Sequence, residues 1–434
     1  MMRAGVRPVT KNIKKPNQAK SYKEATTSKQ KQTKPKPLKN KKKTSKAQKK
    51  AQETQIYTLK QLPKFIRPPK EYIFLEAPIV VPSQEELIHP FKLVKRLHDE
   101  GYMKHGVVKI VPDKSMWNPQ YVFNRHQKLM TSRTQVINDL PRGKPYDQNV
   151  DEYTYEEFKE VAEDFQNNYE YQTQVGLENK YRKNEFEYWS IVENPEKFKE
   201  VEVEYAADLP SSKYGSAFAD LGQLKNTEKG WNLTNINGQK NSLFQFTKEQ
   251  KNTSLSGITT PWVYLGMQFA TFCFHTEDLW MYALNYMHFG EKKTWYTIPP
   301  QFKNKFEEVY KAKYFEIFQK KPDILYLQNL QLSPLEAASA YVPVYRTDQG
   351  PGEFIMTFPK VYHGGFSHGF NCGEAVNIAT TEWLKYYREA VDDYALKGHH
   401  KKVSFPIQWL LQQIIEYLDK SEFNLQDLIN IFGE

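Results

Sequence analysis

The stretch from Val201 to Leu384 consists of many short apolar runs separated by Gly, Pro and Asn. Runs such as KKTWYTIP and EAVNIATTEWL have the length and the β-branched and aromatic content of strands, and turn residues lie between them. Many short strands joined by close turns are typical of a sandwich or barrel of the jelly-roll kind. We therefore predict a mainly β fold with helical additions.

The positive charge of the chain is concentrated at its N-terminus. Residues 1–50 hold 16 Lys and 2 Arg against one acidic residue, Glu24, so residues 51–434 carry −7 although the whole chain carries +10. We predict a basic disordered tail at residues 1–55 attached to a mildly acidic body. The run KNKKK at residues 39–43 is a candidate for nuclear import or nucleic-acid attraction, and the alternative is a solubilising tail.

Composition excludes several classes of protein. An aromatic fraction of 14% is too high for a disordered chain. Only two cysteines occur, Cys273 and Cys372, too few for a disulfide framework or a Cys-rich zinc finger, so we expect no structural zinc and a reducing compartment. The longest apolar run, 258–274, is short and interrupted, and no apolar signal region opens the chain, so we expect neither a membrane segment nor secretion.

Three further segments flank the β-rich stretch. Residues 64–118 contain a capping signal, Ser83 with Glu86, before a helix, followed by a strand at 107–111. Residues 119–200 are predicted as a helical linker or buttress, and residues 385–434 as C-terminal helices. The helix after Ser83 has one apolar face, formed by Leu87, Phe91, Val94 and Leu97. The apolar face of the C-terminal helix comprises Ile407, Leu410, Leu411, Ile414 and Ile415.

Three residues of the β-rich stretch can form a metal site. His275 and Glu277 are two positions apart, so on a strand their side chains leave the same face, and His363 in PKVYHGGFSHGF is the best third ligand. Two His and one carboxylate leave open positions on the metal, as in Fe(II) oxygenases. An H-x-E pair alone is weak evidence for a metal site, because most such pairs are ordinary polar residues of the surface or the core.

Neighbouring polar residues are competing candidates. We expect His288 to be a packed or hydrogen-bonded residue. We expect His368 to shape a loop. Asp278 would point to the opposite face from Glu277, and we expect a structural role for it.

These residues also carry a family resemblance. HTED, NYMHFGEKKTWY and GEFIMTFPKVYHGGFSHGFN resemble the JmjC domain of Fe(II)/2-oxoglutarate histone lysine demethylases. PIVVPSQEEL and GVVKIVPDKSMWNP, within 64–118, resemble the JmjN element that accompanies JmjC in some of them. The resemblance implies a double-stranded β-helix, cupin-like core at 201–384 and a JmjN-like unit at 64–118.

The resemblance also implies roles for single residues. His275, Glu277 and His363 match the catalytic Fe(II) ligands. The residues that match the 2-oxoglutarate site are Tyr205, Phe272, Asn285 and Lys293. Those that match the methyl-lysine pocket are Tyr264, Trp262 and Asn377. Without the resemblance, Lys293 would be interpreted as a solvated charge, and Tyr264 and Trp262 as core residues. Ala206 stands where the family usually has Gly, a change that we expect to be tolerated.

The activity implied is demethylation of trimethyl or dimethyl lysine of histone H3, with Fe(II) as cofactor, 2-oxoglutarate and O2 as cosubstrates, and release of formaldehyde, succinate and CO2. FCFHTEDLW, VPVYRTDQ and GWNL resemble the branch acting on lysine-4, and lysine-9 or lysine-36 is the alternative. Expected partners are the methylated H3 tail, nucleosomal DNA through the basic tail, and subunits of a chromatin complex, all in the nucleus. A catalytically silent chromatin-binding module and a 2-oxoglutarate-dependent protein hydroxylase are the other functions considered.

Overall fold

The computed structural model of the chain describes residues 57–58, 74–122, 128–129, 132–148, 152–174, 179–247, 255–398 and 405–420. These residues all belong to one compact unit. The predicted basic tail and residues 421–434 of the predicted C-terminal helices lie outside the described residues. None of the described helices combines the length and apolar character that crossing a bilayer requires.

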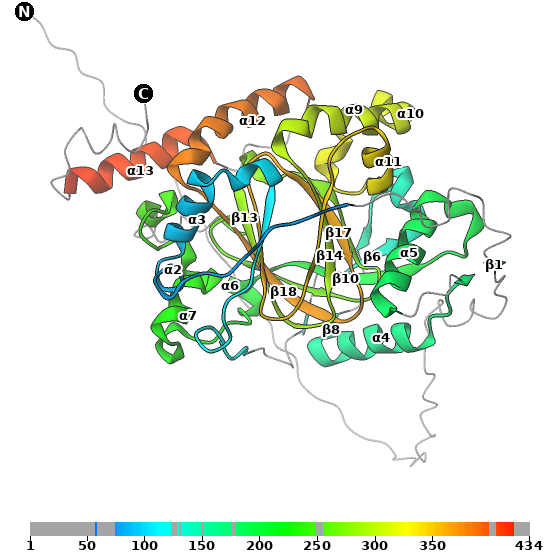
Figure 1. The fold of residues 1–434 in the computed structure, drawn as a ribbon, viewed down its shortest axis with the longest axis horizontal. Coiled ribbons are helices and arrows are strands. Elements are labelled where there is room, and N and C mark those ends of the chain that lie inside the picture. Colours follow the sequence, from blue (N-terminus) through cyan, green and yellow to red (C-terminus); the bar gives the residue numbers. More distant parts are fainter. Residues whose placement is uncertain are drawn as a thin grey trace, which may run out of the picture. The chain divides into compact units, whose positions relative to one another are not determined.

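Two β-sheets form the centre of the fold (Figure 1). The larger has nine strands in the order β3 (Ile79–Val80), β4 (Val107–Ile110), β16 (Phe354–Thr357), β13 (Tyr282–Gly290), β18 (Asn371–Ile378), β11 (Trp262–Gly266), β10 (Glu202–Pro210), β6 (Ser132–Val136) and β7 (Asp147–Gln148). The smaller has five, in the order β12 (Thr271–His275), β17 (Tyr362–Ser367), β14 (Lys293–Ile298), β15 (Tyr345–Gln349) and β2 (Leu75–Glu76). The mainly β prediction is thereby confirmed.

Alternation along β14 separates a pocket side from a core side. Lys293 and Trp295 line a pocket between the sheets. Tyr296, one position on, turns to helix α5 (Lys180–Glu193), where its hydroxyl accepts a hydrogen bond from Trp189 Nε1 at 2.8 Å. Because successive side chains of a strand leave opposite faces, the sequence KTWY lines the pocket on one face of β14 and packs into the core on the other.

Two β-bulges adjust that alternation at the pocket. On β12 the register with β17 shifts between Phe272 and His275, so both side chains reach the pocket although they are three positions apart. On β10 the register with β11 shifts between Ala206 and Leu209. Asp208, inside that shift, has a φ of 58° and also lines the pocket.

The segment predicted as JmjN-like is joined to the large sheet. The capping box of Ser83 and Glu86 is present, and the predicted apolar face is buried. The expected single helix is in fact two, α2 (Gln84–Ile88) and α3 (Pro90–Asp99), because Pro90 has no N–H to donate and begins a new helix. The following strand, β4, pairs with β16 next to the pocket strands.

The segments before and after the β-rich stretch, residues 119–200 and the C-terminal helices, agree in part with the prediction. Residues 119–200 contain the predicted helices α4 (Tyr155–Asn168) and α5, but they also supply β6, which pairs with β10 and extends the large sheet. The segment is therefore helical in part and also contributes a strand to the sheet. The C-terminal helices are α12 (Leu384–Leu396) and α13 (Ile407–Lys420). Of the predicted apolar face of α13, Leu410 and Ile414 are buried, whereas Ile415 is 47% exposed.

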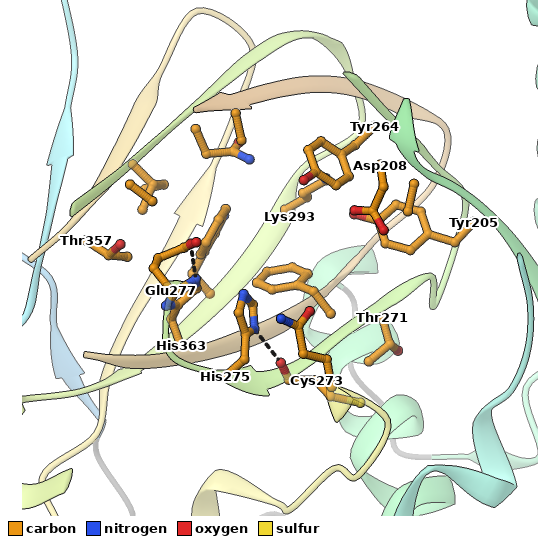
Figure 2. Close-up of a pocket in the computed structure, with 18 of the residues that line it drawn as sticks. Tyr205, Asp208, Tyr264, Thr271, Cys273, His275, Glu277, Lys293, Thr357 and His363 are labelled. Atoms are coloured by element: carbon orange, nitrogen blue, oxygen red, sulfur yellow. Dashed lines mark hydrogen bonds and ion pairs between the residues drawn. The ribbon is translucent and has the colours of Figure 1, made fainter. Parts of the chain in front are cut away.

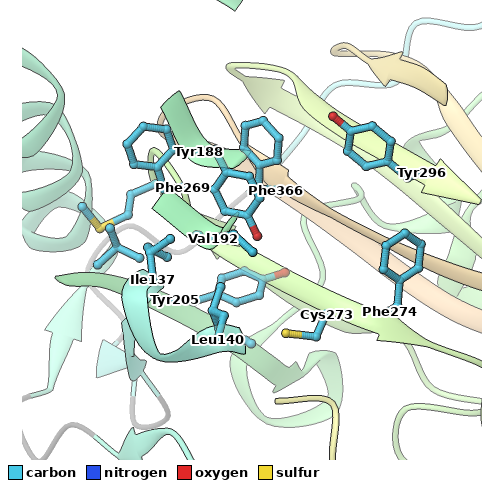
Figure 3. Packing of buried hydrophobic residues seen from close by; sticks show 14 of the residues in the cluster. Ile137, Leu140, Tyr188, Val192, Tyr205, Phe269, Cys273, Phe274, Tyr296 and Phe366 are labelled. Carbon is cyan, nitrogen blue, oxygen red and sulfur yellow. The ribbon is translucent and has the colours of Figure 1, made fainter. Parts of the chain in front are cut away.

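An aromatic core lies behind the five-stranded sheet. Tyr188 of α5 stacks on Phe366 of β17 with ring centroids 4.2 Å apart, and Figure 3 shows Phe269 beside them. All three are buried, so α5 packs tightly against β17, whose second residue is the third candidate ligand, His363. A strand fixed in this way presents His363 in one orientation.

Candidate metal centre and its pocket

The three predicted ligands lie together. His275 ends β12 and pairs in register with His363 of β17, and their rings have centroids 4.3 Å apart. Glu277 Oε1 lies 3.2 Å from His363 Nε2. The ligand atoms of the three residues all lie within 4.8 Å of one another, the arrangement that Figure 2 shows at one end of the pocket. Strand β12 ends at His275, so Glu277 lies in the extended segment after the strand and not on it.

Backbone and side-chain contacts orient these ligands. His275 Nδ1 lies 2.7 Å from the carbonyl oxygen of Cys273, and His363 Nδ1 lies 3.4 Å from that of Val361. With a metal bound, an Nδ1–H that faces a carbonyl would leave the lone pair on Nε2 for the metal. Without metal, His363 Nε2 instead faces Glu277 Oε1 as a hydrogen-bond donor. Asn377 Nδ2 donates to Glu277 Oε2 at 3.0 Å. Asn377, predicted for the substrate pocket, therefore holds the carboxylate ligand.

The carboxylate of Glu277 is kept ionised. Burial by itself raises the pKa of Glu277, but the hydrogen bond and charge of His363 and the charge of His275 outweigh it and lower the pKa to about 2. One anion and two imidazoles, from residues 275–277 and from His363 of β17, form the donor set that suits Fe(II) with open positions. The residues present thus fit the metal that the resemblance implies.

The pocket extends from this triad to a buried lysine. It holds a void of about 770 Å³, a volume that includes open solvent at its mouth. Lys293 is 2% exposed, and among the described residues no carboxylate lies within 4.0 Å of its ammonium group. Burial lowers the pKa of Lys293 from 10.5 to about 8. A buried cation without a counter-ion favours an anionic ligand.

The other predicted cosubstrate residues surround Lys293. Its Nζ lies 5.7 Å from the ring centroid of Tyr205, 5.8 Å from that of Tyr264 and 6.0 Å from that of Phe272. Asn285 also lines the pocket, and its Oδ1 accepts a hydrogen bond from Gln349 Nε2 at 3.1 Å. Tyr205 and Tyr264 come from the nine-stranded sheet and Lys293 and Phe272 from the five-stranded one, so the site exists only between the two sheets.

Several pocket residues were not found from the sequence, and four of them bear on this site. Trp295 stacks at 25° to the ring of His363, with centroids 6.0 Å apart. It could have been found, because it lies two positions after Lys293 on one strand. Thr357 of β16 also lines the pocket. Arg133 and Asp208 form an ion pair in the pocket wall, but they are far apart in the sequence and belong to no motif. Asp208 lies beside Tyr205 in Figure 2.

Several predicted residues lie elsewhere. Trp262 is outside the pocket lining: its indole N–H donates to Ser256 Oγ at 2.8 Å. His288 Nε2 lies 3.1 Å from Glu374, buried as expected. His368 follows β17 and its Nε2 lies 2.7 Å from Thr294 Oγ1. These contacts confirm that neither histidine joins the triad.

The chain is similar to known proteins over most of the described body. Residues 262–378 match the family described as JmjC domain, hydroxylase. Lysine-specific demethylase JMJ703 of rice is 33% identical over 74% of this chain and 29% of its own length. Lysine-specific demethylase 5B of chicken is 33% identical over 73% of this chain and 19% of its own. Human lysine-specific demethylase 5D is 36% identical over 58% of this chain and 16% of its own length. The chain spans less than a third of the length of each of these relatives.

Proposed function

Residues 262–378 are a JmjC domain of the hydroxylase type, and from that premise we propose that the chain is a histone lysine demethylase dependent on Fe(II) and 2-oxoglutarate. The observation that supports this most directly is one pocket that holds both a His–Glu–His ligand set and the uncompensated ammonium of Lys293. The first suits an oxygenase metal, and the second suits the far carboxylate of a diacid.

In this proposal each residue has a binding task. His275, Glu277 and His363 hold the iron. Lys293 and the hydroxyl of Tyr205 bind the far carboxylate of 2-oxoglutarate, while the ring of Phe272 packs beside it. When bound, the iron supplies oxidation of an N-methyl group by O2 and 2-oxoglutarate, which frees the methyl carbon as formaldehyde and leaves succinate and CO2.

The substrate is proposed to be methylated lysine of histone H3, with lysine-4 favoured. Tyr264 lines the pocket with its ring centroid 5.8 Å from Lys293 Nζ, and an aromatic ring suits a methylammonium because the ion keeps its charge after losing N–H donors. The preference for lysine-4 rests on the resemblance of FCFHTEDLW and VPVYRTDQ to the branch of the family that acts on lysine-4. The names of the relatives favour demethylation over hydroxylation of another protein.

The test is a panel of H3 peptides trimethylated or dimethylated at lysine-4, lysine-9 or lysine-36, incubated with iron, ascorbate and 2-oxoglutarate. We expect mass spectrometry to detect methyl loss on the lysine-4 peptides, with an equal amount of formaldehyde. Hydroxylated product without formaldehyde would identify a hydroxylase. No turnover of any peptide, with 2-oxoglutarate still bound, would identify a silent module.

The affinity for 2-oxoglutarate should depend on pH through Lys293. Below its pKa of about 8 Lys293 is charged and binds the diacid; above it the free protein holds a neutral amine. We expect the dissociation constant, measured calorimetrically with Mn(II) in place of iron, to be flat below pH 8 and to rise about tenfold per unit above it. A Lys293→Met variant should show no such rise, and an equal rise in it would assign the effect to another group.

The basic tail is proposed to attract nucleosomal DNA. Deleting residues 1–50 removes a charge of +17 and should weaken nucleosome binding most strongly at low salt, because Lys contacts release counterions from DNA. Turnover on a short peptide should be unchanged. A tail of the same composition in shuffled order should bind as the native one does, whereas equal binding by the deleted protein would refute the proposal. Binding is measured by titration at several salt concentrations.

A further inference from the structure

The backbone directly after Glu277 adopts a turn that its sequence does not favour. Met281 N–H donates to the carbonyl of Asp278 at 3.1 Å, and the two central residues, Leu279 and Trp280, have φ values of 52° and 51°. Turns with positive φ at both central positions are usually built from Asn and Gly, because a Cβ crowds the backbone there. A Leu–Trp pair persists in this conformation only where its surroundings hold it.

Two side chains from the C-terminal part of the fold hold this turn. The Leu279 N–H donates to the hydroxyl of Tyr394 at 2.8 Å. The indole N–H of Trp383 donates to the Leu279 carbonyl, also at 2.8 Å. Tyr394 lies on α12, and Trp383 directly precedes that helix. Both hydrogen bonds are buried, so each group of Leu279 would lack a partner if its bond were removed.

Helix α12 is itself fixed by a buried ionic network. Asp393, next to Tyr394, accepts from Lys303 at 3.1 Å and from Lys397 at 2.7 Å. Both lysines also contact Glu307 Oε1, at 2.8 and 2.6 Å, on helix α9 (Lys303–Lys313), which lies beside α12 in Figure 1.

That network also reaches the other side of the metal site. Glu307 Oε1 accepts a third hydrogen bond, from the hydroxyl of Tyr362 at 2.8 Å. Tyr362 directly precedes His363 on β17. The segment 393–394 of α12 is therefore connected to the backbone beside two of the three ligands, Glu277 and His363.

We propose that Tyr394 is a positioning residue for the metal carboxylate. Its hydroxyl, together with the Trp383 indole, holds the left-handed turn at Leu279, and this turn presets Glu277 in the ligand geometry before metal arrives. The inference rests on the metal site of the proposed function. It extends that site to a helix beyond residues 262–378, the part that matches the JmjC family.

The test compares three variants of the full chain. Tyr394→Phe and Trp383→Phe each remove one donor or acceptor to Leu279 and keep an aromatic ring. Tyr387→Phe is the matched control: it lies on the same helix, but its hydroxyl accepts from Ile407 N–H at 3.0 Å and donates to the Phe405 carbonyl. Mn(II) alone is titrated into each apo protein, and the thermal midpoint of each apo protein is recorded separately.

We expect the Mn(II) dissociation constant to rise about tenfold or more in Tyr394→Phe and Trp383→Phe, as for groups that orient metal ligands elsewhere, and less than twofold in Tyr387→Phe. A purely structural role would lower all three midpoints and leave Mn(II) affinity alone. Unchanged affinity in a folded Tyr394→Phe or Trp383→Phe protein overturns the inference and leaves the metal site standing. Failure of the unaltered protein to bind Mn(II) overturns both.

Discussion

Replacing His275 with Ala should abolish formaldehyde release from a methylated H3 peptide and leave the fold intact. His275 ends β12 at the pocket wall, and its ring faces His363 with centroids 4.3 Å apart, so its loss removes one of three donors at a single point. Loss of groups that merely orient a ligand costs about 10- to 100-fold in metal affinity or activity, so loss of a ligand should exceed about 100-fold. Formaldehyde release and Mn(II) titration measure the effect.

His98→Ala is the matched control for this variant. His98 lies on α3 and is not among the pocket residues, so both metal affinity and turnover should be retained. Circular dichroism and the thermal midpoint establish that His275→Ala is folded. Undiminished turnover by a folded His275→Ala protein would exclude this residue as a ligand and with it the proposed centre.

Replacing Lys293 with Met should have opposite effects on binding and on stability. The variant loses the ammonium that pairs with the 2-oxoglutarate carboxylate, so its affinity should fall by about 3 kcal/mol, or roughly 150-fold. The apo protein should become more stable near pH 7. The folded-state pKa of Lys293 is lowered from 10.5 to about 8, so burying the charged form costs about 3 kcal/mol below pH 8, a cost that a methionine side chain does not carry.

The size of this stability effect depends on pH. The unfolded chain holds a proton on Lys293 up to about 10.5, whereas the folded protein releases it above about 8, so the penalty shrinks as pH rises between these values. The advantage of Lys293→Met should therefore be largest below pH 8 and fade above it. Thermal unfolding at pH 7 and 9, without and with 2-oxoglutarate, measures both effects. A variant that is less stable at pH 7 would show that Lys293 is compensated in the native protein.

The sequence was informative for site residues that lie in short, recognisable motifs. The spacing of His275 and Glu277 in HTED and the glycines after His363 indicated a metal site, and the family resemblance added Lys293 in EKKTWY. All four residues line one pocket. The mainly β architecture followed from strand-sized apolar runs in the same way. The register of the strands could not be predicted from the sequence. That register matters because the pairing of His275 with His363 brings the ligands together.

Other features depend on long-range geometry and could not be predicted. The bulge on β12 places Phe272 and His275 on one side, against simple alternation. Arg133 and Asp208 meet only because β6 and β10 pair. Trp262 lies two positions before Tyr264, but its indole N–H donates to Ser256 Oγ, a contact that spacing along the strand does not reveal.

The pairing of β4 with β16 and of β10 with β11 has a practical meaning for anyone trimming this protein to a minimal enzyme. A recombinant piece limited to the family match would cut the large sheet on both sides, baring the backbone N–H and C=O groups of β16 and β11. Exposed strand edges of that kind recruit other chains, so such a piece should aggregate. The shortest workable fragment must start before Val107 and retain the strand that begins at Ser132, well outside the boundaries of the family match.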